Sequence, residues 1–374
     1  PATWPEADYV VGNPPFIAGQ NLRESLGDGY AEAIWSCFRS VPRSADFVMY
    51  WWHVSANTLR SSKLARFGLI TTNSIRQIFN QRVIENHIDH RNPLSIVFAI
   101  PDHPWSNLTG DADVRISLTV AEGGHKQGIL KRVHKEESPD DVNKGQEVEF
   151  TQSSGRIRCN LTIGPNTLGT KSLLSNSGIS KDGVKLHGQG FLIDAEDLEY
   201  FSEKEYENIF DVVRPYRNGR DLNQKSRNKY VIDLYGYTEL EASSKFPLLY
   251  QRIYESVRPK RVATRSRTSD AEYYAENWWI FGKPRPELRK AIQDLERFIG
   301  TVDTSRHRIF RFIDSNVTCD DSIVHICAAD AFFLGILSSH VHLAWALDTG
   351  TWLGVGNDSR YNKTRCFEKF PFPD

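Results

Sequence analysis

The first third of the chain alternates short apolar runs with segments of helical periodicity. The predicted elements are strands over 7–12, 67–72, 94–100 and 114–121 and helices over 45–59 and 77–86. The helix over 45–59 is apolar on nearly every face, which indicates that it is buried. Strand–helix alternation at this spacing predicts a parallel sheet with helices on both faces. Ligands of such sheets bind at the carboxyl ends of the strands.

The character of the sequence changes near residue 126. Residues 136–149 are polar and acidic and predict a solvated loop or hairpin. Farther on, the predicted elements are helices from Thr238, over 286–298 and over 330–350, and strands over 230–234, 308–313 and 322–327. We therefore expect an α/β domain over 1–150 and an α+β domain over 151–374.

Composition is that of an ordinary globular protein: 374 residues, 40% apolar, with a net charge of −1. The five cysteines are scattered without a Cys-x-x-Cys pair, which fits a reducing compartment and argues against a zinc site. No proline precedes a cysteine, so the covalent cytosine-C5 route has no candidate nucleophile. We expect no metal site, and His340 and His342 are better interpreted as packed side chains.

The most apolar stretch, residues 328–347, contains Asp330, His340 and His342, so a buried helix is a better interpretation than a membrane span. We expect no signal peptide. The chain begins at Pro1 rather than Met and enters a strand almost at once, so we expect it to be part of a longer protein. We expect a cytoplasmic protein with no membrane partner.

A chemically informative tetrapeptide, Asn13-Pro14-Pro15-Phe16, follows the first strand. It is typical of methyltransferases that use S-adenosylmethionine to methylate a planar amino nitrogen. The side-chain oxygen of Asn13 and the carbonyl of Pro14 can each accept one N–H of the amine, which directs the nitrogen lone pair at the methyl group. Phe16 can stack on an extracted base. The alternative is a strand that runs into a proline-rich turn.

Basic residues concentrate in three stretches of the second domain. Residues 214–229 hold six basic side chains against one acid, Asp221, and residues 258–267 hold five and no acid. The third stretch, 306–311, has its basic side chains beside Phe310 and Phe312. Any one stretch alone is better explained as a solvated face. Three of them downstream of an amino-methyltransferase signature favour contact with DNA phosphates and base edges.

Longer strings resemble the MmeI-like enzymes, type IIL restriction–modification proteins with a γ-type N6-adenine DNA methyltransferase. The strings are residues 8–28, 46–52, 67–75, 99–105, 216–222, 353–358 and 370–373, which span essentially the whole chain. The resemblance implies a partial Rossmann-like methyltransferase sheet, its C-terminal half, over 1–150. It implies a target recognition domain over 151–374 and double-stranded DNA as the partner.

The resemblance also implies roles for particular residues. Asn13, Pro14, Pro15 and Phe16 match the catalytic tetrapeptide, and Trp105 matches an aromatic that stacks on the flipped base opposite Phe16. The candidates for DNA contact, without assignment to bases, are Arg217, Asn218, Arg220, Arg306, His307, Arg308 and Arg311.

Two parts of such an enzyme are missing from the sequence. The glycine-rich loop for S-adenosylmethionine precedes Asn-Pro-Pro-Phe in this family, and too few residues precede it here. No lysine has Asp or Glu two positions before it, so the nuclease motif is also absent. We expect both portions to lie upstream in the same polypeptide, and the chain alone to be inactive in methylation but able to bind DNA. The alternatives are a stand-alone DNA-binding specificity module and an amino-group methyltransferase acting on protein or RNA.

Overall fold

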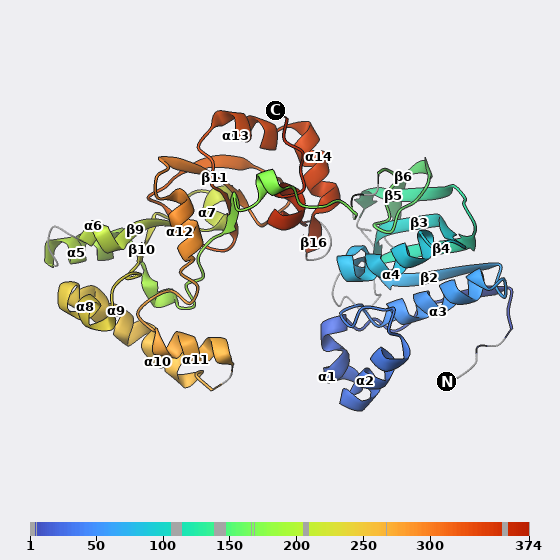
Figure 1. Ribbon diagram of the computed structural model, residues 1–374, viewed down its shortest axis with the longest axis horizontal. Coiled ribbons are helices and arrows are strands. Elements are labelled where there is room, and N and C mark those ends of the chain that lie inside the picture. Colours follow the sequence, from blue (N-terminus) through green and yellow to red (C-terminus); the bar gives the residue numbers. More distant parts are fainter. Residues whose placement is uncertain are drawn as a thin grey trace. The chain divides into compact units, whose positions relative to one another are not determined.

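The chain forms two compact units in the computed structural model (Figure 1). The residues that the structure describes are 4, 6–105, 114–137, 147–165, 167, 169–204, 209–266, 268–353 and 358–373. The first unit comprises Pro1–Gly169 with Thr351–Asp358, and the second Thr170–Gly350 with Ser359–Asp374. The expected boundary at 150/151 falls inside strand β6 (Glu147–Gly155), which pairs with β5 (Gly128–Glu137), so the division lies farther along the chain.

The first unit contains a six-stranded mixed sheet. The other strands are β1 (Tyr9–Gly12), β2 (Arg66–Thr72), β3 (Leu94–Trp105) and β4 (Val114–Gly123), and the order is β1-β2-β4-β3-β5-β6. The predicted α/β class is confirmed, but the prediction of a parallel sheet is wrong. Only β1/β2 and β3/β5 pair in parallel. The connection over 106–113 is shorter than the dozen or so residues that a parallel crossover needs, so β4 returns antiparallel to β3.

Helices cover one face of this sheet. The helices against its strands are α3 (Val48–Arg60) and α4 (Ile78–Ile88), and α1 (Leu22–Leu26) and α2 (Asp28–Cys37) join the same hydrophobic core. Trp52 on α3 is fully buried, and its ring packs edge-on against Phe67 of β2 with centroids 5.2 Å apart. On the other face, Tyr9 and Val11 of β1 are 66% and 87% exposed and line an apolar hollow of about 530 Å³ with side chains of β2, β3 and β4.

The second unit has two four-stranded sheets, in the orders β14-β9-β10-β8 and β13-β11-β15-β7. The strands are β7 (Ser180–Asp182), β8 (Leu192–Ile193), β9 (Val213–Arg217), β10 (Lys229–Ile232), β11 (Arg297–Val302), β13 (Phe310–Asp314), β14 (Thr318–Cys319) and β15 (Ile323–Ile326). The short strand β12 (Thr304–Ser305) pairs with β17 (Asp358–Arg360), and β16 is Thr351–Leu353. The predicted α+β class of this part is confirmed.

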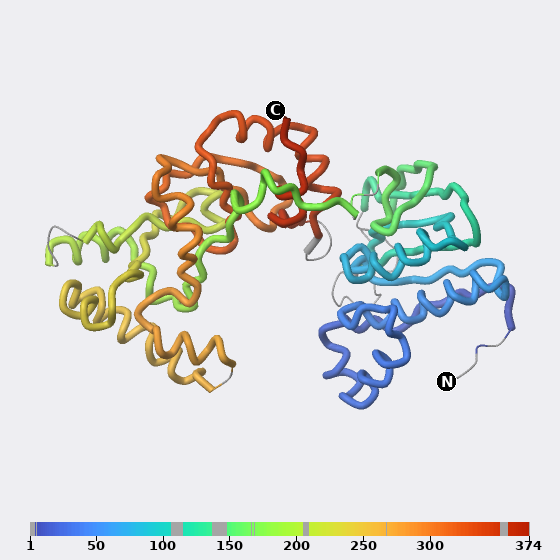
Figure 2. The backbone as a smooth tube through the Cα atoms, viewed as in Figure 1, coloured from blue at the N-terminus to red at the C-terminus, as the bar shows by residue number. Residues whose placement is uncertain are grey.

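Ten helices of the described residues accompany these sheets. They are α5 (Ala195–Lys204), α6 (Ile209–Val212), α7 (Gly219–Asn223), α8 (Glu239–Lys245), α9 (Pro247–Ser256), α10 (Arg258–Ala263), α11 (Ser269–Glu276), α12 (Pro286–Ile292), α13 (Ala331–Leu337) and α14 (His340–Thr349). The beginning and the end of the unit meet: the side chain of Asn176 donates to the carbonyls of Phe367, Glu368 and Phe370 (green beside dark red in Figure 2).

Two predicted helices are shorter in the structure. The segment 286–298 ends as a helix at Ile292, and β11, which was not predicted, follows from Arg297. The segment 330–350 is two helices, bent by 61°, because Ser339 caps α14 by accepting from the backbone N–H of His342 at 3.3 Å. No single helix among the described residues is long and apolar enough to cross a membrane, although α13 and α14 together would meet those limits.

A buried histidine makes the second unit sensitive to acid. His325 on β15 stacks on Phe298, with ring centroids 4.6 Å apart, and burial lowers its pKa from 6.5 to about 4. The His325 imidazole binds a proton more readily in the unfolded chain than in the folded one. The free energy of unfolding is therefore unaffected by this group above pH 6.5 and decreases as the pH drops towards 4. We expect His325 to lower the free energy of unfolding by about 2 kcal/mol between pH 7 and pH 5.

Urea unfolding of the chain at pH 7 and pH 5 measures this loss. His325→Phe keeps a ring against Phe298 but cannot titrate, so its loss should be smaller than that of the wild type by the same amount. An equal pH dependence in both proteins would show that His325 does not titrate with a lowered pKa.

Candidate active site and nucleic-acid interface

The tetrapeptide Asn13–Phe16 lies where β1 ends, at one edge of the first unit's sheet. β1 and β2 run in parallel, with Gly12 opposite Leu69, so the carboxyl end of β2 is at the same edge. Asn13 is exposed and Pro14 is buried, and Phe16 is 40% exposed. The asparagine and the aromatic ring are therefore accessible, while the proline between them holds the backbone against the unit.

The segment that follows the tetrapeptide is held against the start of α3. The backbone N–H of Gly19 donates to Asp46 Oδ1 at 3.0 Å, and the N–H of Phe47 donates to the carbonyl of Ile17 at 2.9 Å. A Cβ at residue 19 would lie 2.2 Å from the carbonyl oxygen of Ser44, so only glycine fits this close approach. These contacts fix the exit of the loop that carries Asn13 and Phe16.

The side chain of Asp46 is buried, and hydrogen bonds satisfy both of its oxygens. Besides the Gly19 N–H, it accepts from the Ser74 hydroxyl and from Asn80 Nδ2, the latter at 2.9 Å. Asn80 also donates to the carbonyl of Ser74 at 2.8 Å. Ser74 lies in the short 3-10 helix η2 (Asn73–Arg76), directly after β2. Asp46 therefore joins the tetrapeptide loop to the end of the neighbouring strand.

Trp105 lies at the same edge, at the end of β3. It is 40% exposed and stands opposite Val114, the first residue of β4. Beside it, Arg115 donates through Nε to Asp102 Oδ1 at 2.7 Å and through Nη2 to Glu136 Oε1 at 2.6 Å. The structure thus brings the predicted residues Asn13, Phe16 and Trp105 to one edge, with both aromatic rings accessible.

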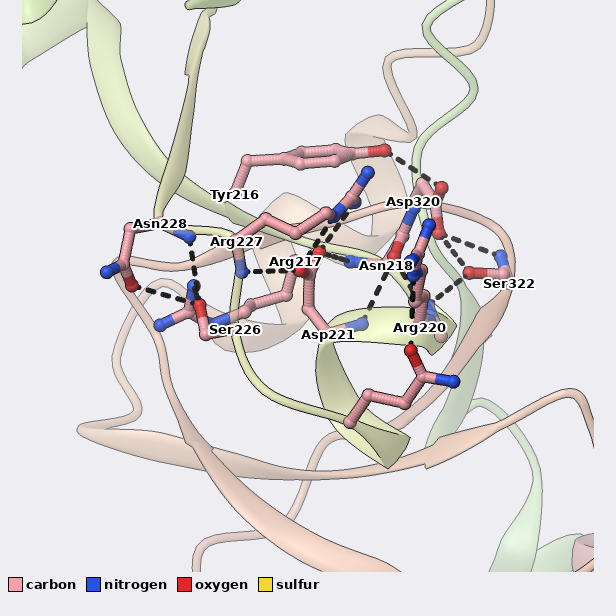
Figure 3. Close-up of polar contacts among 12 residues, drawn as sticks. Tyr216, Arg217, Asn218, Arg220, Asp221, Ser226, Arg227, Asn228, Asp320 and Ser322 are labelled. Atoms are coloured by element: carbon pink, nitrogen blue, oxygen red, sulfur yellow. Dashed lines mark hydrogen bonds and ion pairs between the residues drawn. The ribbon is translucent and has the colours of Figure 1, made fainter. Parts of the chain in front are cut away.

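In the second unit, α7 and the loop after it organise the first basic stretch (Figure 3). Asn218 caps α7, accepting from the N–H groups of Arg220 and Asp221 at 3.1 and 3.2 Å. Asp221 accepts from Arg227 at both carboxylate oxygens, Nε at 2.9 Å and Nη2 at 2.8 Å. The hydrogen bonds from Arg227 and the backbone hold the pKa of Asp221 at about 2, against the effect of its burial.

The third basic stretch meets the first at α7. Asn223 Nδ2 donates to Ser305 Oγ at 3.0 Å, and Arg311 Nη1 donates to the carbonyl of Leu222 at 3.0 Å. Arg220, Arg306, His307 and Arg311 are exposed, and Arg217 and Asn218 are half-buried. Arg308 is half-buried as well, so none of the seven predicted contact residues is fully buried.

The charges around α7 are mostly uncompensated. No carboxylate among the described residues lies within ion-pair distance of Arg217, Arg220, Arg306 or Arg311. Other cations of the unit are paired, for example Arg289 with Asp233 at 2.7 Å. We name the exposed basic side chains around α7, those of Arg220, Arg306, His307 and Arg311, the α7 cationic surface. Such a surface attracts a polyanion and releases its counterions on binding.

The Arg308 side chain makes different contacts from those of its neighbours in the sequence. Its guanidinium donates to the carbonyls of Val302, Asp303 and Ser359, the last at 2.7 Å, and lies over the ring of Tyr361. Burial lowers the pKa of this guanidinium. All of these partners belong to the chain itself, so Arg308 has a structural role, and its contact with DNA stays a prediction.

Two arginines of the second basic stretch also make contacts within the unit. Arg261 on α10 is 5% exposed and donates to six backbone carbonyls, those of Leu186, His187, Tyr274, Asn277, Trp278 and Ile280. Burial lowers its pKa to about 10. Arg265 pairs with Glu276 at 2.9 Å. Arg261 and Arg265 therefore both have partners within the second unit.

Sequence reasoning missed three residues that build these sites: Gly19, Asp46 and the buried Asp221. The signal for Asp221 was available, because it is the one acid among six basic residues in 214–229. No local signal marked Gly19 or Asp46, since their bonds join segments 27 residues apart.

The comparisons with known proteins agree with this division of the chain. Residues 3–130 match the family model described as the MmeI DNA-methyltransferase domain, and residues 170–374 match the model of the MmeI target recognition domain. The chain therefore belongs to the MmeI family, and carries parts matching both of these domains. No curated protein matches it.

Two solved structures give the extent of the similarity. One is the type IIL restriction–modification enzyme MmeI in complex with DNA, with 19% identity and a TM-score of 0.71; the match covers 98% of this chain and 46% of that chain. The other is the type IIG restriction endonuclease BpuSI, with 11% identity and a TM-score of 0.31; the match covers 98% of this chain and 47% of that one. This chain thus spans less than half the length of the proteins it matches.

Proposed function

We propose that this chain is the back half of a DNA methyltransferase, with its target recognition domain, within a restriction–modification enzyme. The enzyme transfers a methyl group from S-adenosylmethionine to adenine N6 in a specific DNA sequence. The observation that carries the proposal is the exposed Asn13–Phe16 edge in a chain whose second unit matches a target recognition domain. A protein that acts on host and invading DNA belongs in the bacterial cytoplasm.

The residues of this edge act by position and charge. The side-chain oxygen of Asn13 and the carbonyl of Pro14 accept the two N–H groups of the target amine, which frees its lone pair for attack. Phe16 and Trp105, both 40% exposed, stack on the two faces of the extracted base. The two prolines hold the loop without offering N–H groups that would compete for the acceptors.

The cofactor requires more residues than the described part of the chain supplies. S-adenosylmethionine supplies the methyl group. We expect its adenosine and methionine parts to bind at a glycine-rich turn between a strand and a helix. Gly27 joins α1 to α2, and Gly188 precedes a 3-10 helix, so neither forms such a turn. The described residues do not by themselves fit the cofactor, and we place its main site upstream in the same polypeptide.

The open face of the sheet supports an upstream portion. Tyr9 and Val11 expose large apolar surfaces beside a hollow that Phe98 and Leu118 also line. A globular protein seldom leaves such a contiguous apolar surface in water. We propose that the upstream methyltransferase portion covers this face, that a nuclease portion lies farther upstream, and that the chain alone binds DNA without methylating it.

Arg306 and Arg308 test the DNA-binding part of the proposal, because they differ in exposure but are two residues apart. We expect Arg306→Ala to weaken DNA binding at low salt and to lower the slope of log K against log salt by about 1. Arg308→Ala should instead lower the free energy of unfolding, because the carbonyls of Val302 and Ser359 lose their donor. Fluorescence anisotropy over a salt series and urea unfolding measure the two effects.

Arg220→Ala should repeat the Arg306→Ala result, since both side chains belong to the α7 cationic surface. Unchanged salt slopes for Arg220→Ala and Arg306→Ala would move the DNA-binding surface to another part of the chain. A steeper loss of binding for a stably folded Arg308→Ala than for Arg306→Ala would support the prediction that Arg308 contacts DNA.

Two alternatives use the same observations. A stand-alone DNA-binding specificity module would need only the second unit, with the first as a scaffold. A protein or RNA amino-group methyltransferase would use Asn13–Phe16 on another planar amine, but it has no evident need for the α7 cationic surface or for a target recognition domain. The presence of a glycine-rich strand–turn–helix in the upstream gene sequence would favour the enzyme over the module.

A further inference from the structure

A continuous polar network runs along the catalytic edge of the first unit. Its first part is Asp46, which binds the Gly19 N–H on one side and Ser74 and Asn80 on the other. Its second part begins at Asn73, the residue before Ser74. The Nδ2 group of Asn73 donates to Asp102 Oδ1 at 3.2 Å. Asn73 and Ser74 therefore connect the tetrapeptide loop to the end of β3.

Arg115 extends the network across the next strands. It binds Asp102 of β3 through the side chain and also through the carbonyl, at 3.3 Å, and it binds both oxygens of Glu136 on β5. The Arg115 side chain is 9% exposed, so little water screens these ion pairs. Pro104, the residue before Trp105, stands directly opposite Arg115 in the sheet register.

Each end of this network holds one of the two aromatic residues that are proposed to stack on the base. Phe16 belongs to the loop that Gly19 and Asp46 hold, and Trp105 belongs to the strand end that Asp102 and Arg115 hold. We infer that Asp46, Asp102 and Arg115 are positioning residues that set the separation of Phe16 and Trp105 around the flipped base. This inference rests on the proposed function, because it assigns a role to residues behind the same site.

The chemistry of Asp46 makes the inference testable. Its two oxygens accept three hydrogen bonds, from Gly19, Ser74 and Asn80. An asparagine has the same shape but only one accepting oxygen, so Asp46→Asn loses at least one of these three hydrogen bonds and weakens the link between the loop and the η2 segment. Arg115→Lys keeps the charge but cannot span Asp102 and Glu136 together, because lysine lacks the planar fork.

The test uses the whole protein that contains this chain, with a DNA duplex carrying the target sequence. We expect Asp46→Asn and Arg115→Lys each to lower kcat by about 10- to 100-fold, because small displacements of reacting groups have effects of this size. KM for DNA should change little, since the α7 cationic surface is untouched, and the thermal midpoint should change little, since both replacements keep nearly the same side-chain volume. With 2-aminopurine at the target adenine, the fluorescence of the bound complex should differ from that of the wild type.

Asp89→Asn is the matched control, because Asp89 has an exposed ion pair with Arg156 at 3.4 Å in the same unit. It should retain the wild-type kcat and the wild-type fluorescence. Wild-type kcat and fluorescence in both test variants would overturn the inference, as would a loss of kcat that only follows a lowered thermal midpoint. A wild-type protein that does not methylate DNA would instead contradict the proposed function.

Discussion

Asn13→Ala is expected to lower the rate of methyl transfer by the whole protein by roughly a thousandfold, because removing one preorganised hydrogen-bonding group from a transition state has an effect of this size. DNA affinity should stay within about twofold of the wild type. Asn13 is exposed at the sheet edge and makes no part of the network through Asp46, so its removal leaves the fold intact. The amine would lose one of its two acceptors and keep its lone pair delocalised into the ring.

Transfer of a labelled methyl group to duplex DNA measures this effect, and anisotropy measures the affinity. Asn21→Ala is the matched control: it removes the same side chain from an exposed position at the end of the short 3-10 helix Gly19–Asn21, where that side chain makes no capping hydrogen bond to α1. The control should retain wild-type activity. Equal activities for Asn13→Ala and the wild type would exclude Asn13 from the chemistry.

Arg261→Met should destabilise the second unit by about 3–5 kcal/mol, as breaking a buried charged network does. The guanidinium donates to six carbonyls from three segments of the unit, with the shortest bonds to Leu186 at 2.6 Å and Ile280 at 2.8 Å. Methionine fills similar space but donates nothing, so all six carbonyls lose this donor, and among the described residues only those of Leu186 and Asn277 keep a backbone N–H, from Gly282 and Ile280.

Urea unfolding of the chain measures the loss, with Arg265→Met as the control. Arg265 lies four residues on and is about half exposed, and its pairs with Glu272 and Glu276 are at the surface. Exposed pairs contribute about 0–1 kcal/mol, so the control should be near wild type. A loss for Arg261→Met no larger than for Arg265→Met would show that the carbonyl contacts do not stabilise the unit.

The parts of the fold that depend on local pattern could be predicted from the sequence. The helix over 45–59 and the strand over 67–72 correspond closely to α3 and β2, because their apolar periodicity is set by their own residues. The direction of β4 could not be predicted from alternation, since it depends on pairing with β2 and β3. Strand β11 was hidden because the helical pattern of α12 continues past Ile292.

The two candidate sites also differ in how far the sequence alone predicts them. Asn13–Phe16 is a contiguous motif at the end of a strand, so the sequence alone places it at the sheet edge. The sequence gives the number of basic residues but not which of them are exposed. Arg306 and Arg308 are alike in sequence, yet one is exposed and the other bonds the carbonyls of Val302 and Ser359. Only the paths of β12 and β17, brought together from distant segments, decide which side chain meets solvent.

Long-read sequencing of host DNA that expresses the whole gene, beside an Asn13→Ala strain, tests the central claim most directly. The proposal predicts N6-methyladenine at one fixed sequence motif, and its loss in the Asn13→Ala strain. Such a result would establish the reaction and its specificity together. Modified cytosine in place of adenine, or no modified base in either strain, would contradict an adenine-N6 methyltransferase.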